Sequence, residues 1–519
     1  MTSKAAGHHS QPTNATNALT PTSIEMRRGC TLATVLCTLV MASYTLVAYS
    51  VFFSNQLQLL WKPAWSLCAS PFLHGHHIHI PAATSSSATH TDLSDIVFAL
   101  GGSSQTWEKR RAYAELWWHP NKTRGHVWLD SAPSGPLPDK GPPYRVSRDA
   151  SRYGKAAPAS RMANIVVEAY ELVSLEQEKN EVRWFVMGDD DTVFFPENLV
   201  TVLQKYDHEQ MYYVGMPSES VEQDVMHGYG MAFGGGGFAI SYPAAAELAR
   251  VMGACLDKYA HFYGSDERVH ACFVELGIPL TREPGFHQLD LKEDVYGMLA
   301  AHPLAPLVSL HHLDYVKPVI SNKPNQKEAL QSIFSAYEAD RARILQQAFC
   351  YDTRAGAESV LSVSVSCGYT VQVYPQELVA NELETPLLTF KTWRGSNGPF
   401  IFNTRPFSSD PCARPFIFFL ESVQHNQTDV TLTQYTRNKN ADDHEAQAEG
   451  KVNCTNQGFS VASRIEKVKV FAPKMDPSLW KQAPRRHCCK TQMTEQGTML
   501  EVQIKSCSPG ESTTVPIST

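Results

Sequence analysis

The sequence lacks the short motifs that most often mark nucleotide or redox enzymes. It has no G-x-x-x-x-G-K-[ST] loop and no G-x-G-x-x-G run opening a helix, which argues against a P-loop enzyme and a dinucleotide-dependent oxidoreductase. No C-x-x-C pair or cysteine–histidine spacing fits a zinc site. No stripe of basic residues interleaved with aromatic residues is present, so no nucleic-acid partner is expected. The formal net charge of -7 over 519 residues also indicates neither nucleic acid nor an acidic substrate.

One long uncharged run stands near the N-terminus. Residues 30–53 carry no charge, are mostly apolar and exceed the roughly 20 residues that a helix needs to cross a bilayer. Arg27 and Arg28 precede the run, and no basic residue follows until Lys62. The positive-inside rule therefore predicts a cytosolic tail at 1–29, a single-pass type II signal anchor, and a lumenal remainder. A cleaved signal peptide is the alternative, but the run is longer than a usual signal-peptide core and lies behind a longer polar leader.

Two features of the remainder agree with a lumenal location. N-x-T glycosylation sequons follow the run at Asn121, Asn426 and Asn453. Ten of the twelve cysteines also lie after it, an even number in a compartment where disulfides form. The pairing stays open, although the adjacent Cys488 and Cys489 indicate two separate bridges.

The remainder divides by its residue pattern into a stem and two folded parts, as its length also suggests. Residues 54–92 lack periodic apolar spacing and are interpreted as a stem. Strands and helices alternate in 93–345, which predicts a three-layer α/β domain. Residues 346–519 predict a smaller β-rich domain with a disordered insertion near 437–451. The expected strands are 96–100, 126–129, 182–187, 211–215, 237–241, 360–373 and 415–420, and the expected helices are 107–118, 160–175, 199–206 and 243–255.

The most informative segment is RWFVMGDDDTVFF, at residues 183–195. A buried strand is expected to end at Gly188, where the chain can turn sharply. Asp189 and Asp191 are two residues apart, so in an extended segment both point the same way and can offer oxygen ligands to Mg²⁺ or Mn²⁺ bridged to phosphates. Asp190 points elsewhere. A solvated acidic turn is the alternative, which the apolar flanks make less favourable.

Three further segments carry polar or glycine-rich patterns. FGGGGFAISYP, at 233–243, places four glycines before a strand, where the backbone can approach a ligand or simply form a loop. Asp266 and Glu267 start a helical pattern, where first-turn charge is the simplest explanation. His287 lies in a Pro/Gly turn and is expected on a loop, where it can complete a metal site or be a surface residue.

These segments resemble, in order, the Fringe-related glycosyltransferases, most closely their plant-type branch of uncharacterised members. The set is RWFVMGDDDTVFF, FGGGGFAIS, YGSDERVHACFVELGIPL, GFHQLD and HPLAPLVSLHHLD, and the similarity spans roughly 95–314. The resemblance places the chain in the glycosyltransferase family 31 group of β-1,3-glycosyltransferases. It implies a GT-A-type nucleotide-sugar-binding domain, with a mixed sheet and helices on both faces, and a Golgi membrane location.

The resemblance also implies a divalent metal, Mn²⁺ or Mg²⁺, held against the diphosphate of a UDP-sugar donor. Asp191 matches the direct ligand, Asp189 lies nearby, and His287 matches the family's second protein ligand. His311 and His312 are alternatives that we rank below His287, because adjacent histidines on a strand point to opposite faces.

The donor pocket is implied on the same alignment. Asp190 corresponds to a residue near the donor ribose, and Arg110 loosely matches a basic residue of the pocket. Gly235, Gly236 and Gly237 are expected to let donor and acceptor sugars approach the backbone.

Asp266 occupies the position of the Fringe catalytic base. Fringe enzymes carry two adjacent aspartates there, whereas this chain has Asp266 followed by Glu267, so the base can be either residue. The expected activity is inverting transfer from a UDP-sugar to a glycan or glycoprotein acceptor, with a β-1,3 linkage. The alternative is a catalytically silent Fringe-like protein that binds glycans or acts as a scaffold. A lumenal metal-dependent hydrolase would need more histidine and aspartate ligands than the sequence offers.

Overall fold

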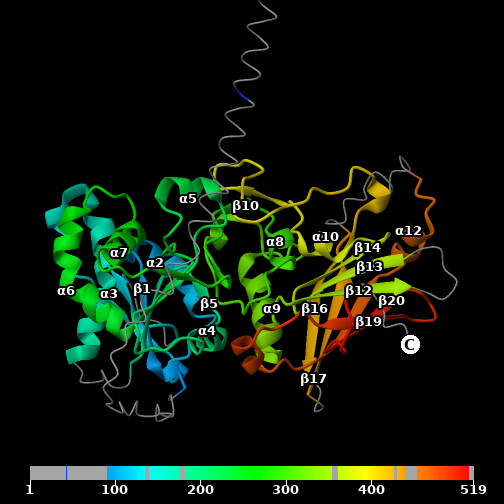
Figure 1. Cartoon of the computed structure of the whole chain (residues 1–519), viewed down its shortest axis with the longest axis horizontal. Coiled ribbons are helices and arrows are strands. Elements are labelled where there is room, and N and C mark those ends of the chain that lie inside the picture. The colour runs from blue at the N-terminus through cyan, green and yellow to red at the C-terminus, as the bar shows by residue number, and fades with distance from the viewer. Residues whose placement is uncertain are drawn as a thin grey trace, which may run out of the picture. The chain divides into compact units, whose positions relative to one another are not determined.

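The computed structural model describes Ser43 and residues 90–134, 140–175, 182–353, 360–425, 429–439 and 453–513 (Figure 1). Apart from Ser43, the expected anchor at 30–53 lies outside the described residues, as do most of the stem and most of the insertion near 437–451. None of the helices in the described part is both long and apolar enough to span a bilayer. The described residues from His90 onward belong to one compact unit, Ala88–Thr519.

A seven-stranded mixed sheet organises the α/β part, in the order β3-β2-β1-β4-β7-β6-β8. Strand β1 lies parallel to β2 and β4, whereas β7 runs antiparallel to β4 and β6. The strands are β1 (Ile96–Gly101), β2 (Arg124–Leu129), β3 (Tyr144–Val146), β4 (Trp184–Asp189), β6 (Tyr213–Gly215), β7 (Phe238–Ser241) and β8 (Leu280–Arg282). The sheet is mixed, as the GT-A-type expectation requires.

Both faces of this sheet are covered by helices. Side chains that alternate along β1 enter different cores: Phe98 packs in one with Trp107, and Ala99 packs in the other with Ile165 and Leu248. One core involves α2 (Ser104–Ala114) and α4 (Pro196–Leu203), and the other involves α3 (Ala157–Leu175), α6 (Tyr242–Lys258) and α7 (Ser265–Glu275). The helices expected from the apolar spacing therefore occur, with ends shifted by a few residues.

A small three-stranded sheet lies beside the acidic motif. It contains β5 (Val193–Phe194), β11 (Ser309–Leu310) and β9 (Phe286–His287), with β11 between the other two. Pairing of β5 with β11 brings residues that follow the acidic motif next to the segment that contains the two adjacent histidines. His287 is therefore a strand residue, not the loop residue that the sequence suggested.

The C-terminal part is built on an eight-stranded sheet, in the order β12-β13-β14-β16-β17-β18-β20-β19. Its strands are β12 (Gln347–Thr353), β13 (Val360–Ser366), β14 (Thr370–Tyr374), β16 (Phe416–His425), β17 (Val430–Arg437), β18 (Lys467–Pro473), β19 (Cys488–Met493) and β20 (Met499–Lys505). The single strand expected at 360–373 is a hairpin, because Gly368 turns the chain with a φ of +70°.

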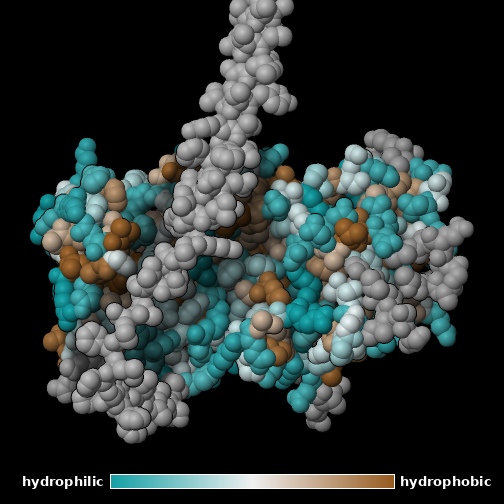
Figure 2. All heavy atoms as spheres, viewed as in Figure 1, coloured by the Kyte–Doolittle hydropathy of each residue, from teal (hydrophilic) through white to brown (hydrophobic). Residues whose placement is uncertain are grey.

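The two parts share a hydrophobic core. One continuous cluster of buried residues includes Phe98 and Leu199 from the α/β part and Val363 and Phe418 from the C-terminal sheet. Helix α9 (Gln326–Ala339) contributes Leu330 to the same cluster. On the face drawn in Figure 2, hydrophobic residues form small scattered patches among mainly hydrophilic ones.

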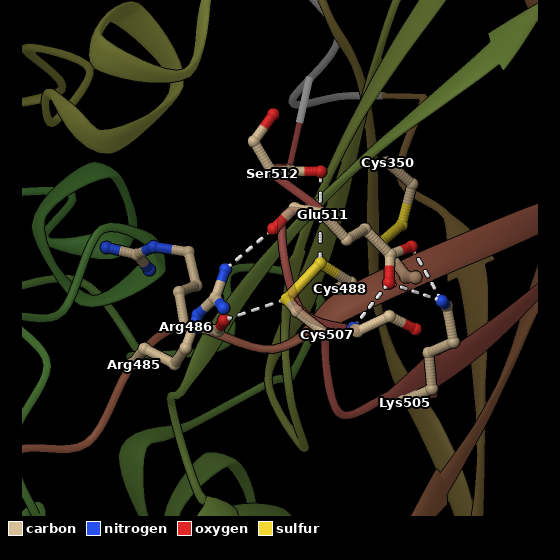
Figure 3. Close-up of a disulfide and its surroundings, with 10 residues drawn as sticks. Cys350, Arg485, Arg486, Cys488, Lys505, Cys507, Glu511 and Ser512 are labelled. Carbon is tan, nitrogen blue, oxygen red and sulfur yellow. Dashed lines mark hydrogen bonds and ion pairs between the residues drawn. A yellow bond between two sulfur atoms is a disulfide. The ribbon is translucent and has the colours of Figure 1, made fainter. Parts of the chain in front are cut away.

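Disulfides are concentrated in the C-terminal part. Cys350–Cys489, Cys412–Cys454 and Cys488–Cys507 connect residues of this part, and Cys255–Cys272 joins α6 to α7. Figure 3 shows Cys488–Cys507 beside the ion pair of Lys505 with Glu511. Cys488 and Cys489 thus belong to separate bridges, as predicted from their adjacency.

Candidate functional site

The acidic motif lies where β4 leaves the sheet. Asp189 is the last residue of β4, and Asp190 and Asp191 form a turn that the Thr192 amide closes by donating to the Asp189 carbonyl at 3.1 Å. A Cβ at Gly188 would lie 2.9 Å from the Phe194 ring, so the close packing of this turn favours glycine. Asp189 and Asp191 therefore come together through a turn, not through the strand alternation that we expected.

A histidine completes a compact group with these carboxylates. The Nε2 atom of His311 lies 3.2 Å from Oδ1 of Asp191 and 3.7 Å from Oδ2 of Asp189. One candidate ligand atom from each of the three residues lies within 4.8 Å of the others. Asp191 and His311 are buried, whereas the Asp189 side chain is 34% exposed. The group is therefore open to solvent on the side of Asp189.

The charges of this group depend on one another. Although its side chain is partly exposed, desolvation by the surrounding protein raises the pKa of Asp189 to about 7; His311 opposes this shift and the neighbouring carboxylates add to it. Burial also opposes ionisation of Asp191, but contact with His311 lowers its pKa to about 2. For His311, burial is outweighed by the two aspartates, which raise its pKa to about 9. Asp191 is therefore held as a carboxylate.

Arg110, on α2, contacts two carboxylates of the motif, those of Asp190 and Asp191. Its Nη1 lies 3.0 Å from Oδ1 of Asp190, and its Nη2 lies 3.2 Å from Oδ2 of Asp191. The hydroxyl of Thr106 donates to the other oxygen of Asp190 at 3.1 Å. Asp190 is 2% exposed and is enclosed by protein groups, so its expected place near the donor ribose stays a prediction.

The structure does not bring His287 into the aspartate group. Its Nδ1 lies 3.1 Å from Oε1 of Glu219, and its ring centroid is 5.0 Å from that of His302. Burial lowers the pKa of His287 to about 4, so the ring is neutral. The expected ligand set therefore changes at one position, and the histidine beside the aspartates is His311.

His311 was ranked below His287 on the assumption that His311 and His312 alternate as residues of a strand. Strand β11 ends at Leu310, and His312 has a left-handed φ of 52°, so the two histidines do not alternate as strand residues do. Their rings lie together, with centroids 3.9 Å apart. The Nδ1 of His312 also lies 2.9 Å from Oδ1 of Asp290, which fixes the ring.

The glycine run makes room for protein groups. A Cβ at Gly235 would lie 2.0 Å from the His311 ring. The Gly236 amide donates to Gln288 at 2.6 Å, and Gly237 has a φ of +81° that favours glycine. All three glycines are buried, and Gly235 provides the space for the His311 ring, while their expected role of admitting sugars stays a prediction.

Asp266 lies in the first turn of α7 and faces the same hollow as Asp189. The amides of Gly234 and Glu267 each donate to one of its carboxylate oxygens at 3.0 Å, and burial raises its pKa. Asp189, Gly234 and Asp266 all line one small hollow that is open to solvent. Glu267 is held elsewhere, because its carboxylate contacts His227 at 2.5 Å and accepts from the Gly264 amide at 2.8 Å.

Two residues of the site were missed in the sequence. The Thr192 hydroxyl donates to the Gly235 carbonyl at 2.7 Å, which ties the acidic motif to the glycine run. Thr192 directly follows the three aspartates, so its position next to the motif could have identified it as part of the site. Gln288 holds Gly236, and its side chain lies 3.4 Å from Asp290, but nothing in the sequence pattern distinguishes it.

Comparisons with known proteins agree with this geometry. A model of Fringe-like domains matches residues 93–341, and the model described as "Protein of unknown function, DUF604" matches 223–489, more than half of the chain. The chain is 31% identical over 150 residues to a Beta-1,3-glucosyltransferase of Mus musculus, covering 28% of each protein. It is 30% identical over 121 residues to a Beta-1,3-glucosyltransferase of Homo sapiens, covering 22% of each.

The chain thus spans less than a third of the length of these curated relatives. The relationship to a Fringe-like domain covers the whole seven-stranded sheet and every residue of the aspartate–histidine group. The chain therefore belongs to the family described as "Protein of unknown function, DUF604", and its α/β part is a Fringe-related glycosyltransferase domain.

Proposed function

We propose that this protein is a metal-dependent, inverting glycosyltransferase that moves a sugar from a UDP-sugar to a hydroxyl of a glycan or glycoprotein acceptor, forming a β-1,3 linkage. The observation that carries the proposal is the convergence of Asp189, Asp191 and His311, with Asp189 lining the same hollow as Asp266. The Beta-1,3-glucosyltransferases named above support the sugar chemistry and the linkage.

The aspartate–histidine group fits a divalent cation. Two carboxylates and one imidazole suit Mn²⁺ or Mg²⁺. The buried oxygens of Asp191 have ion-pair contacts with His311 and Arg110 but no hydrogen bond. Such a cation, when bound, supplies positive charge that neutralises the diphosphate of the donor. Arg110 holds Asp190 and Asp191 in place and adds a fixed positive charge at the same turn.

Asp266 is the proposed general base. The acceptor oxygen attacks the anomeric carbon while the bond to the diphosphate breaks on the opposite face, and the hydroxyl proton passes to the Asp266 carboxylate. Two backbone amides orient this carboxylate, and the burial that raises its pKa makes it a stronger base. The contacts of Glu267 with His227 and Gly264 favour Asp266 over its neighbour.

A type II Golgi membrane protein with its catalytic domain in the lumen is the location that we propose. Four disulfides in the described residues support an oxidising compartment, and the sequon residues Asn121 and Asn453 are exposed. Removal of N-glycans by a glycosidase should increase the electrophoretic mobility of protein isolated from its native cells. Unchanged mobility together with a cytosolic position by immunofluorescence would contradict this location.

The function is tested by UDP release from a panel of UDP-sugars, with full-length protein in Mn²⁺ or in EDTA. We expect Mn²⁺-dependent release from at least one sugar. Asp191→Ala should abolish this release by weakening metal and donor binding. Asp266→Asn should lower it while donor binding is kept, because the amide cannot accept the proton.

A matched control is Glu421→Gln, which changes an exposed carboxylate of β16 and should leave UDP release unchanged. Neither binding nor hydrolysis of any UDP-sugar would contradict the proposal and favour the silent glycan-binding or scaffold alternative. Release that persists in EDTA would contradict the metal dependence alone.

A further inference from the structure

Trp393 belongs to the C-terminal part but lies beside the aspartate–histidine group. Strand β15 (Phe390–Thr392) pairs with β10 (Leu291–Glu293), and Trp393 follows directly. Its ring stacks on His312, with centroids 4.8 Å apart and planes inclined by 21°. The ring of His312 in turn lies against that of His311, with centroids 3.9 Å apart and planes tilted by 31°. A residue from the C-terminal part is therefore one ring removed from the proposed metal ligand.

The aromatic contacts continue outward to solvent. The Tyr315 ring meets Trp393 edge-on, with centroids 4.9 Å apart, and also contacts His312 at 5.3 Å. Tyr315 is 50% exposed and Trp393 is half-buried. Exposed aromatic surface of this kind is typical of ligand sites that also carry a few polar groups.

The turn that carries Trp393 is fixed on two sides. The Thr392 amide donates to the Ser396 carbonyl and the Gly395 amide donates to the Thr392 carbonyl, each at 2.8 Å. The Arg394 amide donates to Glu222, on α5 (Val221–His227), at 2.7 Å. The ring is thus held before any ligand arrives, which lowers the entropic cost of binding.

The polar groups around these rings indicate an uncharged ligand. Asp314, the residue before Tyr315, is exposed and accepts a hydrogen bond from the Tyr113 hydroxyl at 2.6 Å, so the segment that carries Tyr315 also carries a carboxylate. A carboxylate accepts sugar hydroxyls but repels phosphate. Lys292 lies 5.6 Å from the Trp393 ring, but its side chain is exposed and can be displaced. The apolar face of a pyranose ring can pack on the exposed aromatic carbons of Trp393 and Tyr315, while its hydroxyl groups can donate to a nearby carboxylate.

We propose that Trp393 and Tyr315 form the acceptor subsite, which binds a neutral pyranose ring of the acceptor glycan next to the donor. This inference rests on the proposed transferase function. It assigns the C-terminal part a role in substrate recognition, through a residue that lies outside the matched Fringe-like segment.

The test measures glycan binding and UDP binding separately, so that neither needs turnover. Labelled full-length protein with Mn²⁺ and UDP is applied to an array of neutral and acidic oligosaccharides, and UDP affinity is measured by calorimetry. We expect Trp393→Ala to weaken binding to neutral glycans by at least about tenfold, while Trp393→Phe, which keeps a ring, stays close to wild type. UDP affinity should change less than about twofold in both variants, because the Trp393 ring contacts His312 and not the proposed metal ligands themselves.

Arg394→Ala is the matched control, because it changes the next residue of the same turn but leaves the Trp393 ring. It should leave glycan binding unchanged. Weaker UDP binding in Trp393→Ala would show that the ring stacks on the uracil of the donor and would overturn the proposal. Unchanged glycan binding in Trp393→Ala, or binding only to acidic glycans, would also overturn it.

Absence of glycan binding by the wild type would overturn the acceptor subsite as well. The proposed transferase function would still stand in that case if UDP-sugar hydrolysis in Mn²⁺ is observed. Failure of the subsite and failure of the function are therefore distinguishable.

Discussion

The α/β part and the C-terminal sheet are held together in different ways. Fourteen buried side-chain polar atoms of the described residues lack a hydrogen bond, and twelve of them belong to the α/β part. Of the four disulfides that the described residues form, by contrast, three lie in the C-terminal part. Both parts contribute to one continuous hydrophobic core, so the difference is not one of packing.

This difference indicates where the chemistry is located. Buried polar groups without a hydrogen bond are costly. The two oxygens of Asp191 are such groups, since they have ion-pair contacts with His311 and Arg110 but no hydrogen bond, and they lie in the group that fits a cation. Disulfides instead stabilise a fold by restricting its unfolded chain. The α/β part thus buries polar groups at a cost in stability. The C-terminal part is cross-linked by disulfides and reaches the aspartate–histidine group through Trp393, which follows β15 outside the eight-stranded sheet.

The largest expected effect comes from removing a disulfide of the C-terminal part. Cys350–Cys489 spans 139 residues, so replacing both cysteines with serine should lower the free energy of unfolding by about 3–5 kcal/mol. Binding of Mn²⁺ and UDP to the folded variant should persist at low temperature. Denaturant titration measures the first effect and calorimetry the second.

The matched variant replaces Cys255 and Cys272, which are 17 residues apart in the α/β part. The shorter loop predicts a smaller loss, of about 2–3 kcal/mol. A larger loss in this variant than in the Cys350–Cys489 variant would contradict the conclusion that disulfides stabilise the C-terminal part more than the α/β part. Loss of UDP binding at low temperature in the variant that lacks Cys350–Cys489 would contradict the conclusion that this disulfide only stabilises the fold.

The next effect separates two buried histidines of the α/β part. His311→Ala should weaken Mn²⁺-dependent UDP binding by about 10- to 100-fold, since it removes a group in contact with Asp191. His287→Ala should leave that binding close to wild type but lower the free energy of unfolding by about 1–3 kcal/mol, because Glu219 loses its buried partner. Calorimetry and denaturant titration on both variants test this. The reverse pattern would restore His287 as the ligand.

Much of this site followed from the sequence because its groups stand next to a strong strand pattern. A short, nearly continuous apolar run located β4, and Gly188 marked its end, so the three aspartates were placed correctly at the sheet edge. Arg110 was linked to the site only by a loose resemblance, yet the structure brings it to Asp190 and Asp191. Charge placed at the end of a well-defined strand is therefore predictable.

Contacts that depend on irregular backbone were not predictable. The left-handed φ of His312 and the seat that Gly235 provides for His311 have no periodic signature. The stacking of Trp393 on His312 joins positions 81 residues apart through a two-stranded pairing that the sequence does not indicate. Long-range packing of this kind decides which histidine joins the aspartates, and a single sequence does not contain it.

The smallest effect compares two glycines that are equally crowded, one in each part. A Cβ at Gly235 would lie 2.0 Å from the His311 ring, and a Cβ at Gly458, on α12 (Gln457–Ala462), would lie 2.1 Å from the Pro375 carbonyl oxygen. Each substitution to alanine should lower the free energy of unfolding by about 1–3 kcal/mol, because the neighbours must shift. Only Gly235→Ala should also weaken Mn²⁺-dependent UDP binding.

Gly253→Ala is the matched control, because no atom lies within 4 Å of its added Cβ and the position is inside α6. Alanine there should raise the free energy of unfolding by about 0.5–1 kcal/mol, since it favours the helix. Denaturant titration and calorimetry on the three variants separate crowding from chemistry. If Gly458→Ala weakened UDP binding as strongly as Gly235→Ala, the C-terminal sheet would be part of the catalytic centre itself, because crowding alone lowers stability without selecting the metal group.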